Sequence, residues 1–411
     1  MHRLLQFFAL RAIKLRFLTV AVAKLKFCNS LVLCAFFSTA LFAENPAALR
    51  AARALDNRAL AAQVLLTGID GKGALRADMA ALLRAVPAGG VMLFRYNLST
   101  PRGEIAPFLN TVSGAASLPP VAGLPPLPPL IAVDHEGGGV HRFGEGITRL
   151  PAPLSAYTGV ESGAWSREEA LRGIEESAFR SGKELRELGI TVNLAPVAEV
   201  LSPENRAFLG SRSYGPDAGF VEEAAGAFIR GMERAGVLCV VKHFPGNAGG
   251  DPHEEAVSIT LDRAALDRLV RPMIALLCAS PPPLVMVSHA RIPARDAERS
   301  ASLSAAVVSR WLRGEIGFSG VVIADDFSMA GSTEPDTGRA VVAALNAGVD
   351  MVMCWPGNLA ATHQAILDAL ADGTLSRERL VEAASRIIAV KIRAGLFPVP
   401  GGADDAGGRV R

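Results

Sequence analysis

Two short stretches of the sequence concentrate side chains that could act as acids, bases or nucleophiles. KHFPGNAGGDPHEE, residues 242–255, holds Lys242, two histidines and an Asp-x-His element among glycines and prolines. VVIADDFSM, residues 321–329, is an apolar run followed by two aspartates. Carboxylates, imidazoles and an ammonium group together suit the binding of hydroxyl groups and the cleavage of an acetal.

The elements that must position these side chains alternate along the chain. Apolar runs of strand length, such as 236–241 and 284–287, are separated by helical stretches such as 167–189 and 337–348. Because glycine and proline interrupt regular structure, the segment after His243 is predicted to be a loop that follows a buried strand. Seven or eight strand–helix units predict an α/β fold, specifically a single (β/α)8 TIM-type barrel.

In such a barrel, the carboxyl ends of the strands build the site. Six predicted strands end in polar side chains, namely Asn97; Asp134 and Glu136; Asn193; Lys242 and His243; His289 with Arg291; and Asp325 and Asp326. A carboxylate or amide at one strand end could equally cap the next helix. Six such ends together favour a site at one mouth of the barrel.

One domain accounts for most of the 411 residues, because no linker or repeat divides the chain and a barrel with insertions can exceed about 400 residues. The proline-rich segment 118–129 is interpreted as a rigid connection, or alternatively as a proline-dependent binding motif. The predicted organisation is a signal peptide or N-terminal anchor at 1–43, a catalytic barrel at 44–400 and a flexible tail at 401–411.

Residues 1–43 have the parts of a secretory signal peptide. Six basic residues precede the first acidic residue, Glu44, and an apolar stretch at 27–43 ends in small residues. Cleavage is expected after Ala40, or alternatively after Ala43. A signal peptide predicts an exported protein that is periplasmic, secreted or attached to the cell envelope. A permanent anchor and lipid attachment at Cys34 are alternatives, so membrane attachment through the N-terminus stays open.

Charge and cysteine content argue against several classes of partner. The chain has a net charge of +2, or about −4 without its six N-terminal basic residues, which leaves no basic patch for nucleic acid. The five cysteines lack regular spacing and the polar strand ends contain no Cys/His cluster, so neither a disulfide framework nor a metal site is expected. Phosphate-binding glycine motifs and a Gly-x-Ser-x-Gly elbow are also missing from the sequence. The polar strand ends suit a ligand with hydroxyl groups, and none of these patterns indicates a cofactor.

Several motifs occur together in one order: DHEGGGVHRF, APVAEV, GSRSYG, KHFPG with a following DPH, MVSHARI and GFSGVVIADDFSMAG. Through them, the chain from about Gln63 to Leu396 resembles glycoside hydrolase family 3, in particular its β-N-acetylglucosaminidase branch. The resemblance implies a retaining exo-enzyme that hydrolyses terminal β-linked N-acetylglucosamine from peptidoglycan fragments or chitin-type oligosaccharides, without metal or cofactor. The alternatives are another β-glycosidase or a phosphorolytic enzyme of the same fold, and a non-catalytic sugar-binding protein.

The resemblance also implies catalytic roles. The GFSGVVIADDFSM stretch is similar to the family's nucleophile motif, so Asp325 is expected to form a covalent glycosyl-enzyme, with Asp326 supporting it. This branch uses a histidine on the loop after KHFPG as general acid, with an aspartate two residues earlier, and His253 and Asp251 fit those places. A nearby carboxylate orients an imidazole and favours its charged form. An extended backbone at 251–253 is expected to bring both side chains to one side.

Five further residues match family positions that bind the hydroxyl groups of the sugar: Asp134, Arg142, Arg212, Lys242 and His243. Each of them could instead be an ion-pair partner with a structural role.

The loop after KHFPG departs from the family pattern. Asn247 and Ala248 stand where His-Gly is usual, Pro252 replaces a serine, and the loop is about two residues shorter. A smaller departure is Gly139 where arginine is common, with His141 in place of glutamine. The shortened loop is expected to change how His253 reaches the glycosidic oxygen, or which sugar lies beyond the cleavage point, but it removes neither catalytic group.

Overall fold

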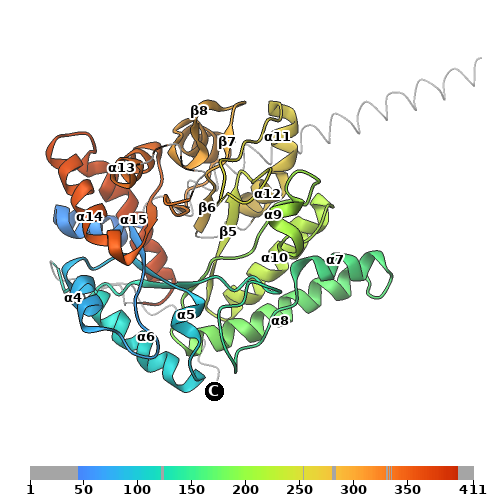
Figure 1. Cartoon of the computed structure of the whole chain (residues 1–411), viewed down its shortest axis with the longest axis horizontal. Coiled ribbons are helices and arrows are strands. Elements are labelled where there is room, and N and C mark those ends of the chain that lie inside the picture. Colours follow the sequence, from blue (N-terminus) through green and yellow to red (C-terminus); the bar gives the residue numbers. More distant parts are fainter. Residues whose placement is uncertain are drawn as a thin grey trace, which may run out of the picture.

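A computed structural model describes residues 45–121, 125–252, 254–279, 284–329, 332, 334 and 336–396. Its centre is a closed barrel of eight parallel strands in the order β1-β10-β9-β6-β5-β4-β3-β2, surrounded by helices (Figure 1). The prediction of a (β/α)8 TIM-type barrel is confirmed. The predicted signal peptide at 1–43 and tail at 401–411 lie outside the described residues.

The barrel strands are short and fully buried, which matches their near-continuous apolar sequences. They are β1 (Leu65–Gly68), β2 (Gly90–Leu93), β3 (Leu130–Val133), β4 (Val192–Asn193), β5 (Leu238–Phe244), β6 (Leu284–Val287), β9 (Val321–Ala324) and β10 (Met351–Cys354). A separate two-stranded antiparallel ribbon, β7 (Arg291–Ile292) and β8 (Asp296–Ser300), follows β6.

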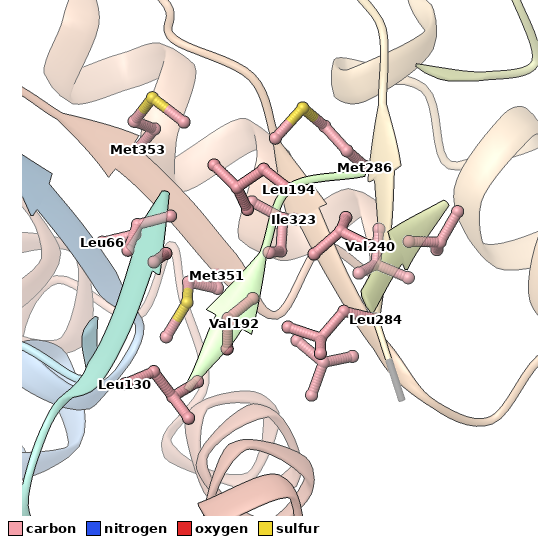
Figure 2. Close-up of a cluster of buried hydrophobic side chains, with 14 of the residues drawn as sticks. Leu66, Leu130, Val192, Leu194, Val240, Leu284, Met286, Ile323, Met351 and Met353 are labelled. Atoms are coloured by element: carbon pink, nitrogen blue, oxygen red, sulfur yellow. The ribbon is translucent and has the colours of Figure 1, made fainter. Parts of the chain in front are cut away.

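The interior of the barrel is filled by side chains rather than by a channel. Figure 2 shows Leu66, Leu130, Val192, Leu194, Val240, Leu284, Met286, Ile323, Met351 and Met353 converging from different strands, and all of them are buried. Inward-facing residues of alternate strands form such layers in a barrel of this kind. Met286 and Met353 also line the pocket described below, so the apolar core forms part of that pocket's wall.

Helices cover the outside of the barrel. They are α2 (Pro46–Ala54), α3 (Asn57–Gln63), α4 (Ala77–Ala85), α5 (Arg95–Leu98), α6 (Arg102–Ala116), α7 (Pro153–Glu161), α8 (Arg167–Glu187), α9 (Arg206–Leu209), α10 (Ala218–Arg234), α11 (Arg263–Leu269), α12 (Arg271–Ala279), α13 (Thr337–Ala347), α14 (Pro356–Ala371) and α15 (Arg377–Arg393). Side chains of Ser166, Asp217, Asp262, Asp336 and Ser376 accept backbone N–H bonds at helix starts, which is the usual N-cap interaction. Within the described part of the chain, no helix is both long and apolar enough to cross a membrane.

A buried charge cluster ties the outer helices to the barrel away from its mouth. Asp350, just before β10, is fully buried and accepts bonds from Arg313 (2.5 Å), Arg379 (2.9 Å) and Arg386 (3.0 Å). Burial alone would raise the pKa of Asp350, but the three guanidinium charges lower it to about 2. These side chains stabilise the frame on which the site is built.

Candidate active site

A pocket of about 250 Å³ lies at the carboxyl ends of the barrel strands. It is lined by Met92, Phe94, Asp134, Glu136, Val140, Arg142, Leu194, Phe208, Arg212, Lys242, His243, Met286, Asp325, Asp326, Met329, Met353 and Trp355. Seven of the nine residues with predicted site roles are in this set. Ligand pockets commonly measure about 300–1,000 Å³, so this pocket is small and suits a single sugar ring.

One wall of the pocket is a buried network centred on Lys242, the residue on β5 that opens the KHFPG motif. Its ammonium group lies 2.8 Å from Asp134 and 2.7 Å from Glu136, and its side chain is only 3% exposed. Asp134 and Glu136 follow β3 and are two residues apart, which places their carboxylates on the same side. The parallel strands thus bring one cation between two anions from another part of the chain.

Two arginines complete this network. Arg212 pairs with Glu136 through two N–H groups, at 2.8 and 2.9 Å, and Arg142 donates to Asp134 at 3.0 Å. Burial would raise the pKa of the Asp134 and Glu136 carboxyl groups, but Lys242 and the arginines lower it, so both are ionised at neutral pH. The opposing charges outweigh burial for Lys242 as well and raise its pKa. The wall therefore presents three cations and two anions that can donate to and accept from sugar hydroxyl groups.

His243 is held by a residue that the sequence reasoning did not single out. The Nδ1 atom of His243 lies 2.6 Å from the Glu199 carboxylate, which is 2% exposed and can only accept, so Nδ1 carries the proton. The same carboxylate accepts the backbone N–H of Asn247 at 2.6 Å. Glu199 thus fixes the imidazole and the start of the loop together, leaving Nε2 as the ring nitrogen that a ligand can use.

Asp325 and Asp326 follow β9, at the edge of the same pocket. Both are half-buried, and the Oδ1 atom of Asp325 accepts the backbone N–H of Asp326 at 2.9 Å. The Asp326 carboxylate turns to the N–H and hydroxyl groups of Ser328 and to the indole N–H of Trp355. The Asp326 carboxylate is therefore bound by its neighbours, while Asp325 keeps one oxygen for a ligand in the pocket.

His289, two residues after the end of β6, the barrel neighbour of β9, supports this pair of aspartates. Its Nε2 donates to the backbone carbonyl of Asp326 at 2.9 Å, and its Nδ1 lies 2.7 Å from the Ser302 hydroxyl. Burial lowers the pKa of His289, although the charge of Asp325 opposes the shift. A neutral imidazole that is bonded on both sides positions the turn and is not a proton donor to a ligand.

The loop after β5 bends at its glycines. Gly246 and Gly249 have φ angles of 133° and 84°, which allow the predicted bend. Asp251 is exposed, and its carbonyl accepts the N–H groups of Glu254 (2.9 Å) and Glu255 (3.0 Å). The expectation of an extended backbone at 251–253 stays a prediction, because a residue whose carbonyl accepts such bonds can itself be extended. His253 lies outside the described residues.

The comparisons with known proteins agree with this geometry. The model named "Glycosyl hydrolase family 3 N terminal domain" matches residues 58–390. The chain belongs to glycoside hydrolase family 3. A β-hexosaminidase of Methylococcus capsulatus is 37% identical over 310 residues, which cover 74% of this chain and 85% of the relative.

Solved structures place this family 3 chain beside two relatives of the branch indicated by its motifs. A β-N-acetylglucosaminidase of Paenibacillus sp. has a TM-score of 0.75 and 30% identity, with coverage of 86% of this chain and 65% of that one. A β-N-acetylhexosaminidase of Beutenbergia cavernae has a TM-score of 0.70 and 29% identity, with coverage of 82% and 98%. The chain spans less than two thirds of the Paenibacillus structure. These findings confirm the predicted family and its β-N-acetylglucosaminidase branch. They also confirm that the chain is a glycoside hydrolase, which acts on carbohydrate.

Not every polar strand end of this glycoside hydrolase faces the pocket. Asn97 is fully buried and donates to the carbonyls of Ile69 (3.0 Å) and Gly71 (2.9 Å). Asn193 exchanges two 3.0 Å bonds with the backbone of His135. Arg291 is exposed on the β7–β8 ribbon. These three residues join backbone segments or face solvent, so the prediction that all six strand ends build the mouth is wrong in part.

The structure adds residues to the pocket that had no predicted role. Glu136 was placed among the polar strand ends but was given no role of its own. Glu199, which lies behind His243, was quoted only within its motif. Phe94 and Trp355 line the pocket from the ends of β2 and β10. Only their position just after an apolar run could have indicated them. Among the described residues, no group of three or more His, Cys, Asp or Glu side chains could hold a metal ion.

Proposed function

We propose that this glycoside hydrolase removes single, terminal, β-linked N-acetylglucosamine residues with retention, from peptidoglycan fragments or chitin-type oligosaccharides. One observation carries the proposal: a pocket of about 250 Å³ closes on the buried Lys242 network on one side and is lined by Asp325 on the other. A pocket of this size takes one ring, and a charged wall satisfies its hydroxyl groups. The rest of the oligosaccharide then lies outside the pocket, as cleavage from the chain end of a sugar polymer requires.

In this proposal Asp325 is the nucleophile. Its Oδ1 is held by the Asp326 N–H, so the other carboxylate oxygen attacks the anomeric carbon as the bond to the leaving oxygen breaks. A covalent glycosyl-enzyme forms, and water later attacks the same carbon and restores the carboxylate. Two inversions give net retention.

The leaving oxygen needs a proton in the first step, and His253 with Asp251 is the proposed source. The resemblance to the branch supports this assignment, and the described part of the loop adds a mechanical argument. Glu199 anchors the loop at Asn247, and the Ser288 hydroxyl donates to the carbonyl of Gly246 at 2.8 Å, so the loop starts from a fixed point beside the pocket. The same histidine would then take the proton from the attacking water.

The hydroxyl groups of the terminal sugar would bind Asp134, Arg142, Arg212, Lys242 and the Nε2 atom of His243. Ions that are already paired with one another need little rearrangement when the sugar enters. This preorganisation is the reason for giving these residues a binding role in addition to their ion pairs.

Export is part of the proposal. The basic and apolar segments at 1–43 support a cleaved signal peptide, and lipid attachment at Cys34 or a retained anchor would place the enzyme on the membrane surface instead. Mass spectrometry of the protein recovered from its native host would distinguish them. A mature N-terminus near Leu41 or Glu44 is expected, whereas an intact N-terminus on a cytoplasmic protein would refute export.

The activity is tested with a panel of chromogenic β-glycosides, with and without added phosphate. Wild-type protein should prefer the N-acetylglucosaminide, release the sugar with retained configuration and show no acceleration by phosphate. Asp325→Ala should lose nearly all turnover and keep its fold by circular dichroism, and a slow fluorinated substrate should label Asp325 in the wild type. Label on Asp326, phosphate-dependent turnover, or binding without turnover would each replace the proposal by a different one.

A further inference from the structure

Three aromatic side chains form a row at the rim of the pocket. Trp355 follows β10, Phe94 follows β2, and Tyr96 lies in α5, the short helix that begins just after Phe94. The Trp355 and Phe94 rings are stacked with centroids 4.8 Å apart, and the Phe94 and Tyr96 rings are stacked at 6.0 Å with an interplanar angle of 3°. Trp355 is 37% exposed and Tyr96 44%, which makes them two of the few large apolar side chains of the described residues that face solvent.

Hydrogen bonds at their polar edges hold the two outer rings in place, and stacking covers the ring faces that meet Phe94. The Trp355 indole N–H donates to the Asp326 carboxylate, and the Tyr96 hydroxyl donates to the carbonyl of Ile69 at 2.7 Å. Asn97 fixes the turn that carries Phe94 by accepting the Phe94 N–H at 2.9 Å. The polar edges of these side chains are satisfied by the protein, so the exposed part of the row is largely apolar ring surface.

The row lies on the side of the pocket formed by β10, β1 and β2, and its Phe94 end adjoins β3, which precedes Asp134 and Glu136. The strands β10 and β2 are the two neighbours of β1, and a Cβ built on Gly68, the last residue of β1, would touch both the Phe94 ring (3.4 Å) and the Trp355 ring (3.5 Å). The network comes instead from β3 and β5. Trp355 also directly follows the strand that neighbours β9, which carries Asp325. The pocket therefore has a charged wall for one sugar and, beside its nucleophile, an aromatic rim that continues outward to Tyr96.

We propose that the row formed by Trp355, Phe94 and Tyr96 is a subsite for the sugar on the leaving-group side of the scissile bond. This inference rests on the proposed function. A β-linked pyranose with equatorial substituents presents apolar C–H groups on both ring faces, and such a face packs against the electron-rich face of an aromatic ring. The terminal sugar fills the small pocket, its anomeric carbon meets Asp325, and the next sugar leaves the pocket past Trp355.

The test compares two substrates that differ only in the leaving group: N,N′-diacetylchitobiose, whose leaving group is a second sugar, and methyl β-N-acetylglucosaminide, whose leaving group is methanol. Trp355→Ala should lower kcat/KM for the disaccharide by about two- to tenfold more than for the methyl glycoside, the range expected for one lost aromatic stack. Trp355→Phe keeps an aromatic ring and removes the N–H that binds Asp326. It should therefore lower kcat/KM for both substrates to a similar extent. Tyr96→Ala should show a weaker form of the Trp355→Ala pattern.

Binding is measured separately by tryptophan fluorescence, because the chain has only three tryptophans and Trp311 is buried. In the Asp325→Ala background, diacetylchitobiose should change the emission, and the change should disappear when Trp355→Phe is added. Trp165→Phe is the matched control: Trp165 is 47% exposed outside this pocket, so its loss should leave the change intact.

The outcomes separate the subsite from the activity. Wild-type protein that cleaves both substrates, with Trp355→Ala lowering both equally and fluorescence unaffected by Trp355→Phe, would overturn the subsite and leave the proposed function standing. Wild-type protein that cleaves neither substrate would overturn the proposed function. The fluorescence titration would then still decide whether the row binds a disaccharide. The subsite is refuted if diacetylchitobiose changes no emission, or if the change persists in Trp355→Phe.

Discussion

Replacement of Lys391 by methionine should stabilise the protein below pH 7 and lose that advantage at high pH. Lys391 in α15 is fully buried, and its described hydrogen bond is to Gln63 Oε1 at 2.7 Å. Burial without a counter-charge lowers the pKa of Lys391 from 10.5 to about 7. Stability therefore rises with pH between about 7 and 10.5, where the unfolded state binds more protons than the folded state, and the full penalty remains below pH 7.

The magnitude follows from this difference in pKa. At 1.36 kcal/mol for each pH unit, the penalty is about 5 kcal/mol below pH 7 and vanishes above about pH 10.5. Lys391→Met removes the penalty but leaves the Gln63 carbonyl unpaired, which costs about 1–3 kcal/mol. The net gain is about 2–4 kcal/mol at pH 6, and it should shrink by about 1.4 kcal/mol per unit between pH 7 and 10.

Urea unfolding of the wild type and Lys391→Met at pH 6 and pH 9 measures this difference, provided that the m-values agree. Lys183→Met, at an exposed position of α8, is the control and should change stability by less than about 0.5 kcal/mol at both pH values. Lys391 contacts Gln63 at the end of α3, just before β1, and so lies away from the mouth of the barrel, which means glycosidase activity should persist. A free-energy difference that is the same at both pH values, or destabilisation at pH 6, would refute the reasoning.

Three further predictions concern the site. His253→Ala should be slow on substrates with poor leaving groups and much less affected on activated aryl glycosides, with Asp251→Ala showing a milder form of this pattern; equal losses on both substrate types would mean that the acid lies elsewhere. Glu199→Gln should lower kcat/KM by about 10- to 100-fold, because one acceptor for the His243 N–H or the loop N–H becomes a donor, and wild-type kinetics would exclude this positioning role. Glu136→Gln should destabilise the fold by about 3–5 kcal/mol, measured by urea unfolding, because the buried Lys242 and the partly buried Arg212 lose a shared anion; an unchanged unfolding midpoint would contradict this.

Much of the fold could be predicted because its signals are local. The apolar runs at β5, β6 and β9 and the amphipathic pattern of α8 are visible in short windows of sequence, and their alternation is characteristic of the barrel. The paired side chains Asp134 and Lys242 were both indicated by their places at strand ends. Their partner Glu136 was placed at the same strand end, but the strand-end argument gave no sign of its ion pairs with Lys242 and Arg212.

The loop after β5 shows where local reasoning stops. The glycines and prolines of this loop predict a bend, and Gly246 and Gly249 provide it with positive φ angles. Glu199, which fixes the start of the loop at Asn247, comes from another part of the chain, and no pattern within the loop indicates that contact.

The sequence by itself determined the strand–helix alternation, the barrel and the chemical types at the strand ends, because hydrophobic periodicity and strand length are properties of neighbouring residues. Only the tertiary structure decided which polar ends face the pocket. Lys242 meets two carboxylates there, whereas the Asn193 side chain bonds the backbone of His135, just after β3. The tertiary structure also stacks the Trp355 ring on Phe94 and places the Glu199 carboxylate where it accepts the Asn247 N–H. Such contacts depend on strand register and on how each loop leaves its strand, and those are set by packing between segments far apart in the chain.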